Sequence, residues 1–200
     1  TVFPPYFVLG AAFSGFAVVS MIAGVLRHAL GLGDLVTPRH LDLLAILLLA
    51  TGLMTAFGYF ADVFDTLYAG EQQDLETLHD RFFGVYAFSY WGAVVANFVP
   101  LQLLWWRRIR RDPLILFLIG LSVAIGMWFE RYMLLVSTLY RDYVVSSWHE
   151  FHPTFWDWSL FAGMFGVFLV PFLLFVRFLP VISAFEVKEA VSEKREARHA

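Results

Sequence analysis

Residues 114–140 read LILFLIGLSVAIGMWFERYMLLVSTLY, an apolar stretch whose charged side chains are Glu130 and Arg131. A transmembrane α-helix needs about 20 predominantly apolar residues to cross the hydrocarbon core of a bilayer. The stretch therefore predicts a membrane-spanning helix that carries two charges inside it. Pro113, directly before the stretch, suits the first turn of such a helix.

The composition of the whole chain agrees with a membrane protein. Of its 200 residues, 60% are hydrophobic and 16% are charged, whereas soluble domains have about 45–50% apolar and about 25% charged residues. The formal net charge of -3 gives no basic surface for nucleic acid, so we expect no nucleic-acid partner. Lipid, lipid-soluble molecules and other proteins remain as partners.

The remaining apolar runs complete an all-α, polytopic fold with five transmembrane helices, a four-helix bundle plus one peripheral helix. We place the transmembrane domain at residues 1–185 and a charged cytoplasmic tail at residues 186–200. Pro100 is expected to kink the third helix, and a neighbouring helix must then satisfy the carbonyl that it frees. The stretch from Glu71 to Asp80 is interpreted as an acidic connector. The predicted helices are 6–26, 41–68, 82–106, 114–140 and 156–178.

Lysine and arginine are distributed unequally between the two sides of this topology, and cytoplasmic segments retain positive charge. Arg81 and Arg141 lie on one side, and the other side holds eleven basic residues. The side with eleven basic residues, and the carboxyl terminus with it, is therefore expected in the cytoplasm. The eleven are Arg27, Arg39, Arg107, Arg108, Arg110, Arg111, Arg177, Lys188, Lys194, Arg195 and Arg198.

The amino end of this topology lies outside the membrane. No initiator Met, basic amino-terminal region or small-residue cleavage site precedes the first helix. The pattern predicts the later part of a longer polypeptide, whose first helix bundle would be a partner of this segment.

Glu130 and Arg131 are the most costly residues of the sequence, because a charge deep in hydrocarbon costs about 3 kcal/mol even on the mildest insertion scale. Adjacent helical residues point in different directions, so each is expected to have its own partner on another helix. Asp62 is the expected partner of Arg131. Either the charges fix helix register as a buried ion pair, or they carry function.

Asp62 and Asp65 are three residues apart and share one helix face with Tyr59 one turn earlier. Paired carboxylates relay protons when their pKa values are pushed apart. Because the helix emerges into water near these residues, a merely solvated helix end is an equal alternative to a proton path.

The chain has no cysteine and six histidines, all in predicted loops, helix ends or the tail. Haem b in a helix bundle needs axial imidazoles within the helices, so this segment is not expected to hold haem or to use a sulfur-ligated metal. His149 and His152, with Glu150 and Asp157 nearby, form a weak metal pattern. An exterior loop that contacts a partner subunit is the commoner explanation, so we assign no metal site.

Four stretches stand out as motifs: Thr1–Phe7, His79–Gly84, Asn97–Pro100 and Met127–Tyr132. Together they resemble the NrfD/PsrC family, membrane subunits of quinone-linked respiratory complexes in the bacterial cytoplasmic membrane. The closest likeness is to the ActC subunit of alternative complex III, and it covers nearly all of residues 1–185 as the later half of such a subunit.

The resemblance implies a subunit that helps to bind and oxidise a quinol, such as menaquinol, near the outer face. It implies electron delivery to a docked iron-sulfur subunit, with iron-sulfur clusters and haem c in partner subunits, and possible proton translocation. Arg131 matches a family motif and is the candidate that stabilises an anionic quinone oxygen. By geometry, Asp62 and Asp65 are candidate proton acceptors, and Trp128 and Tyr59 are candidate ring contacts. The resemblance also implies proton transfer across the bundle, for which Glu130 is the candidate.

Two other functions use the same residue types. A proton-coupled or ion transporter also needs intramembrane acids and arginines, although the sequence has no internal repeat. A non-catalytic anchor for soluble redox subunits would use Glu130 and Arg131 only in packing.

Overall fold

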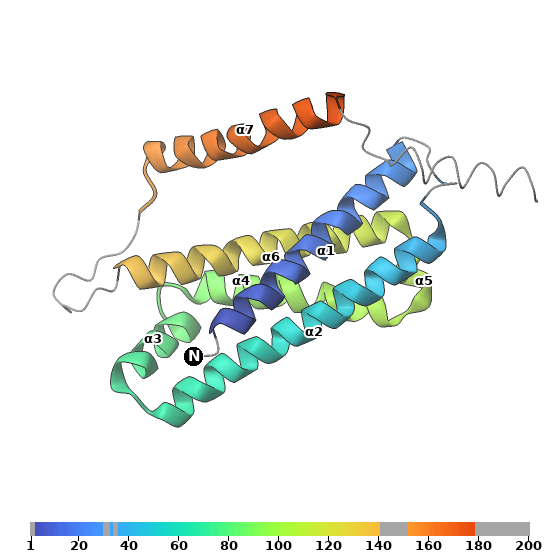
Figure 1. Ribbon diagram of the computed structural model, residues 1–200. Coiled ribbons are helices and arrows are strands. Elements are labelled where there is room, and N and C mark those ends of the chain that lie inside the picture. The colour runs from blue at the N-terminus through green and yellow to red at the C-terminus, as the bar shows by residue number, and fades with distance from the viewer. Residues whose placement is uncertain (1–2, 30–32, 34–35, 141–151, 179–200) are drawn as a thin grey trace, which may run out of the picture. The chain divides into compact units, whose positions relative to one another are not determined.

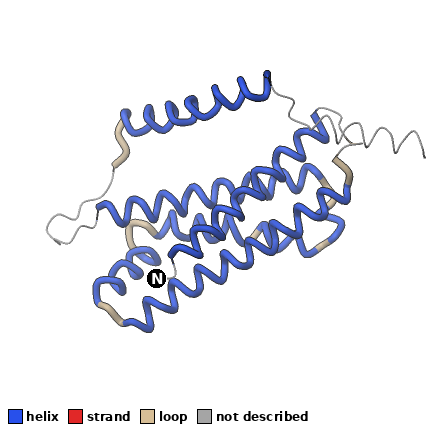
Figure 2. Tube along the Cα trace, in the orientation of Figure 1, coloured by secondary structure: helices blue, strands red, loops and turns tan. Residues whose placement is uncertain are grey.

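The computed structural model describes residues 3–29, 33, 36–140 and 152–178. These residues form helices and short connections, without a strand among them (Figure 2). Five helical segments within them are long and apolar enough to cross a membrane, which confirms the all-α polytopic fold. The elements are α1 (Phe3–Ala29), α2 (Pro38–Ala69), α3 (Gln72–Phe83), α4 (Ala87–Phe98), the 3₁₀ helix η1 (Pro100–Trp105), α5 (Arg107–Arg110), α6 (Pro113–Tyr140) and α7 (Phe155–Phe178).

Residues 1–150 form one compact unit, in which α1, α2, α4 with η1, and α6 run side by side as a bundle of four spans (Figure 1). Helix α1 packs against both α2 and α6, and α4 packs against α6. Fully buried side chains from all four spans fill the centre of the bundle, where removal of apolar surface and tight packing stabilise the helix contacts. They include Phe13, Ala17, Leu48, Leu101, Leu104 and Val123.

The predicted third helix, 82–106, is wrong as a single continuous element. The helix breaks between Phe83 and Ala87, and beyond Val99 it tightens into the 3₁₀ segment η1. Pro100 begins that segment because a proline has no N–H to donate to the carbonyl four residues earlier. That carbonyl, of Ala96, instead accepts a hydrogen bond of 2.9 Å from Ser122 Oγ on α6. The expectation that a neighbouring helix satisfies the freed carbonyl is confirmed.

The acidic connector expected from Glu71 to Asp80 is also wrong, because most of it belongs to helix α3. Helix α2 ends at Gly70, whose φ of 66° is in the left-handed region that glycine adopts without strain. The chain then turns into α3, which buries Leu78. Its many charged residues gave no apolar run, so hydropathy alone missed a short helix at the end of the bundle.

Helix α7 belongs to a second unit, residues 151–200. Asp157 in its first turn accepts hydrogen bonds from the N–H and the hydroxyl of Thr154, both 2.7 Å, which satisfies free donors at the helix start. Pro171 lies inside the helix. The expected peripheral position of this helix, and the cytoplasmic tail at residues 186–200, remain predictions, and the tail lies outside the described residues.

Candidate functional site

Glu130 on α6 is fully buried in the bundle, and its carboxyl group has a hydrogen-bond donor on each side. The hydroxyl of Tyr6 on α1 donates to Oε1 at 2.8 Å, and the hydroxyl of Tyr59 on α2 donates to Oε2 at 2.7 Å. A carboxyl group buried without such donors would cost several kcal/mol. The expectation that Glu130 has its own partner on another helix is confirmed.

The two tyrosine rings are held in place by close packing. Their centroids are 5.7 Å apart in an edge-to-face arrangement, and Phe98 lies edge-to-face on Tyr59 at 5.2 Å. The ring of Tyr6 rests on Gly58, where an added Cβ would lie 2.5 Å from the ring. Glycine at this position therefore lets the Tyr6 hydroxyl reach Glu130.

A small cavity of about 30 Å³ borders these tyrosines, toward the end of the bundle where α2 meets α3. It has room for one or two water molecules, since one water needs about 10–15 Å³ by this measure. It is too small for a quinone ring. The residues around it are Tyr6, Gly58, Tyr59, Asp62, Val63, Leu78, Arg81, Tyr90, Met133 and Leu134.

Asp62 forms its ion pair with Arg81 on α3, with Nη1 and Oδ2 separated by 3.3 Å. The expected pair between Asp62 and Arg131 is wrong, because α3 folds back and brings Arg81 to the same wall of the cavity. The Arg81 side chain is 13% exposed, and its Nε is a buried atom without a hydrogen-bond partner among the described residues. Arg81 belongs to the stretch His79–Gly84, which the sequence marked only as a family motif and not as the source of a partner for Asp62.

Arg131 lies at the α1–α6 contact and is half-buried, with its guanidinium 4.3 Å from the ring centroid of Phe7. An arginine over an aromatic ring gains a cation–π attraction. Within the described part of the chain, Arg131 forms no ion pair. Trp128, one turn earlier, is 39% exposed and stacks on Tyr132 with ring centroids 5.8 Å apart.

The sequence-predicted site residues therefore fall into two groups. Tyr59 and Asp62 line the cavity together with Tyr6, Tyr90 and Arg81. Glu130 does not line it but is joined to it through the hydroxyls of Tyr6 and Tyr59. Arg131 and Trp128 do not line it. Asp65 does not line it either, and its side chain is exposed at the end of α2.

The weak metal pattern of the sequence lies partly outside the described residues, because His149 and Glu150 are not among them. His152 and Asp157 are described, and Asp157 accepts hydrogen bonds from Thr154 at the start of α7. The described residues contain no group of three or more His, Cys, Asp or Glu side chains that could hold a metal ion.

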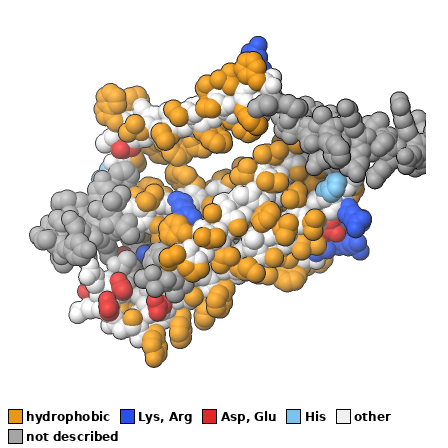
Figure 3. Space-filling view, in the orientation of Figure 1, with side chains coloured by type: hydrophobic (Ala, Val, Ile, Leu, Met, Phe, Trp, Pro, Cys, Tyr) orange, Lys and Arg blue, Asp and Glu red, His pale blue; other side chains and the backbone are white. Residues whose placement is uncertain are grey.

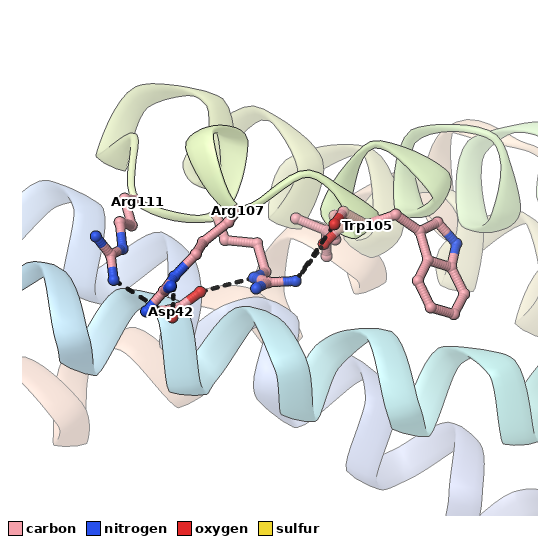
Figure 4. Close-up of polar contacts among 6 residues, drawn as sticks. Asp42, Trp105, Arg107 and Arg111 are labelled. Atoms are coloured by element: carbon pink, nitrogen blue, oxygen red, sulfur yellow. Dashed lines mark hydrogen bonds and ion pairs between the residues drawn. The ribbon is translucent and has the colours of Figure 1, made fainter.

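A second polar cluster lies at the opposite end of the bundle, around Asp42 in the second turn of α2. Figure 3 shows acidic side chains gathered near α3 and basic ones at this other end. Nε of Arg110 donates to Asp42 Oδ1 at 2.7 Å, and Arg107 and Arg111 approach Oδ2 at 3.8 and 3.9 Å (Figure 4). In the sequence, these arginines indicate the orientation of the chain, and no pattern marks Asp42 as their partner.

The fold and these two polar ends define the class of the protein. It is a multi-pass membrane protein whose interior carries a hydrogen-bonded carboxyl group and whose described residues hold no metal-binding cluster.

The family follows from comparison with known sequences. The family model described as "Polysulphide reductase, NrfD" matches residues 1–141, and the chain belongs to this family. Family members are membrane subunits of multi-subunit, quinone-linked redox complexes with iron-sulfur partner subunits. The match ends before α7, so it covers less of the chain than the expected likeness over residues 1–185. Comparison with curated proteins finds no match.

Proposed function

We propose that the chain is the membrane subunit of a quinol-oxidising respiratory complex of the alternative complex III type, in the bacterial cytoplasmic membrane with its carboxyl terminus inside. In this proposal it helps to bind quinol near the outer face, and a docked iron-sulfur subunit takes the electrons. Membership of the NrfD family supports the redox setting. Iron-sulfur clusters and haem c belong to the partner subunits.

The observation that carries the chemical role is the doubly hydrogen-bonded carboxyl group of Glu130. Oxidation of one quinol to quinone releases two electrons and two protons, and the protons need acceptors with an exit to water. Asp62 and Asp65 are the acceptors for these protons. Glu130 transfers a further proton across the bundle, and the hydroxyls of Tyr6 and Tyr59 connect it to the cavity. Asp62 on the cavity wall then passes the proton outward, and exposed Asp65 is the last carboxylate before the surface.

The quinol itself is placed outside the cavity, because about 30 Å³ cannot hold its ring. Arg131 and Trp128 lie three residues apart and hence on neighbouring positions of one helix face. Both are partly accessible, Trp128 at 39%. The Arg131 guanidinium would donate to a quinone oxygen and the indole would contact the ring. Tyr59, which the sequence made a candidate for ring contact, is assigned to proton transfer because its hydroxyl donates to Glu130.

Two variants of the assembled complex test the proposal. Arg131→Leu is expected to lower the rate of quinol oxidation at least about tenfold, since an oriented charge on a developing anion contributes about 2 kcal/mol or more. Glu130→Gln is expected to abolish charge movement across the membrane while electron transfer continues. Asp74→Asn is the control, because Asp74 is an exposed acid on α3 that does not line the cavity.

Each rival function has its own outcome. Full quinol oxidation by Arg131→Leu would contradict the assigned quinol contact. Full activity and full charge movement in both variants would favour a non-catalytic anchor. A transporter would be favoured if the wild-type preparation moves charge without oxidising quinol and Glu130→Gln abolishes that charge movement.

A further inference from the structure

At the end of the bundle around Asp42, three arginines surround a single carboxylate. Arg110 is only 16% exposed, and its Nη1 also donates to the carbonyl oxygens of Leu104 and Trp105, at 3.2 and 3.5 Å. Arg110 thus connects the short helix α5 to α2 and to the end of η1. One carboxylate with one well-placed arginine is a complete pair.

Arg107 and Arg111 are not needed for the pair between Asp42 and Arg110. Their side chains are 71% and 45% exposed, and their distances of 3.8 and 3.9 Å to Asp42 are longer than hydrogen bonds. Each guanidinium has five N–H donors, and those of these two arginines make no hydrogen bond among the described residues. Asp112 forms no ion pair with these arginines among the described residues, and its Oδ1 instead accepts from the N–H groups of Leu114 and Ile115 at the start of α6.

The cluster lies where the apolar spans end. One span ends at Trp105, and the next begins at Pro113. Trp105 and Trp106, which directly precede the arginines, are 58% and 60% exposed. Exposed tryptophans next to basic residues at the ends of spans mark the level of lipid headgroups.

An apolar groove begins two residues after Arg111. It has a volume of about 170 Å³ and lies between the end of α1 and the start of α6. The residues around it are Gly24, Val25, His28, Pro113, Leu114 and Phe117. An apolar groove beside unsatisfied cations matches a molecule with an anionic head and a hydrocarbon tail.

We propose that Arg107 and Arg111 bind the phosphate group of an anionic phospholipid, with one acyl chain in the groove between α1 and α6. Basic sites of this kind at the ends of transmembrane helices bind anionic headgroups. Asp42 keeps the cluster in place through Arg110, and Arg107 and Arg111 offer their remaining donors to the phosphate oxygens. The phosphate replaces the missing negative charge.

Native mass spectrometry of the protein, purified in mild detergent with the subunits it retains, tests this site. The probes are phosphatidylglycerol and phosphatidylcholine with identical acyl chains, offered in equal amounts. Wild-type protein is expected to retain phosphatidylglycerol preferentially, and Arg107→Gln/Arg111→Gln to lose that preference. About fivefold weaker binding is expected for each arginine removed.

Arg108→Gln is the matched control, because Arg108 is an exposed arginine of the same helix that forms no ion pair with Asp42 among the described residues. It is expected to keep the preference. Excess glycerol 3-phosphate, which has the headgroup chemistry without acyl chains, is expected not to displace the lipid. Equal loss in the control, unchanged preference in the double variant, or full displacement by glycerol 3-phosphate would each overturn the proposal.

Discussion

Each of the two polar ends of the bundle holds a carboxyl group, and the two groups have different kinds of partner. At one end, the carboxyl group of Glu130 is fully buried and is held by the uncharged hydroxyls of Tyr6 and Tyr59. At the other, the carboxylate of Asp42 is partly exposed and is surrounded by arginines. A buried arginine would add its own desolvation cost, whereas one at the interface keeps much of its hydration.

The difference between the ends shows where this membrane protein tolerates a cation as the partner of a carboxyl group. The Asp62–Arg81 pair follows the same rule, since the Asp62 carboxylate is 40% exposed, more than that of Asp42 at 15%, and also has a guanidinium partner. From the centre of the bundle outward, the partners of the carboxyl groups change from hydroxyl to guanidinium. Substitutions at each level can test this gradient.

The largest effect is expected from Gly58→Ala. Its Cβ would lie 2.5 Å from the Tyr6 ring, so the ring must move and its hydrogen bond to Glu130 is lost. Overpacking and the lost bond together are expected to lower stability by about 2 kcal/mol. Gly15→Ala is the control, since nothing lies within 4 Å of its added Cβ. The thermal unfolding midpoints of both variants in detergent check this prediction, which fails if the two shift alike.

A smaller effect is expected from Asp42→Asn, which leaves Arg110 without a charged partner at 16% exposure. The cost lies between those of surface and buried pairs, at about 1–2 kcal/mol. Asp65→Asn should change stability by less than about 0.5 kcal/mol, because that carboxylate is exposed. The free energies of unfolding of the two variants, measured in parallel, check this prediction. Equal stabilities would mean that α5 is held without the carboxylate.

Removing single hydroxyls from the buried cluster should cost less again. Tyr6→Phe and Tyr59→Phe are each expected to lower stability by about 1 kcal/mol, the net value of one hydrogen bond. Combining each with Glu130→Gln gives a double-mutant cycle that measures the coupling. Additive effects would show that the hydroxyl and the carboxyl group do not depend on each other.

The smallest effect concerns salt. At 1 M salt the Debye length is about 3 Å, so charges exposed to water are screened and buried groups are not. The effect of Arg107→Gln/Arg111→Gln on stability, about 0.5 kcal/mol at low salt, should therefore vanish. The loss in Tyr59→Phe should stay constant in the same titration. A salt-dependent loss in Tyr59→Phe would contradict the contrast between the two ends.

Hydropathy located the membrane spans because each has its own apolar run, and the cost of burying Glu130 required that a partner exist. The sequence also located the carbonyl freed by Pro100, since that consequence follows from the missing N–H of one residue. These predictions rest on the chemistry of single residues and short stretches, which can be read from the sequence without knowledge of the tertiary structure.

The ion pairs could not be assigned in the same way. Arg81 reaches Asp62 only because α3 is a helix that folds back on the bundle, and its charged residues resemble those of a loop. Asp42 and Arg110 are 68 positions apart in the sequence. Tyr6 carries no pattern that separates a hydrogen-bonding phenol from one that faces lipid. Such partners depend on tertiary arrangement.

The 3₁₀ segment η1 has a consequence for the bilayer around the protein. A 3₁₀ helix rises about 2.0 Å per residue against about 1.5 Å for an α-helix, so η1 gains about 3 Å over its length. The 19-residue segment from Ala87 to Trp105 thereby reaches about 30 Å, the thickness of an average hydrocarbon layer. The length of this span matches such a layer without tilt, and as the shortest span of the bundle it is the one that a thicker, sterol-rich membrane would strain first.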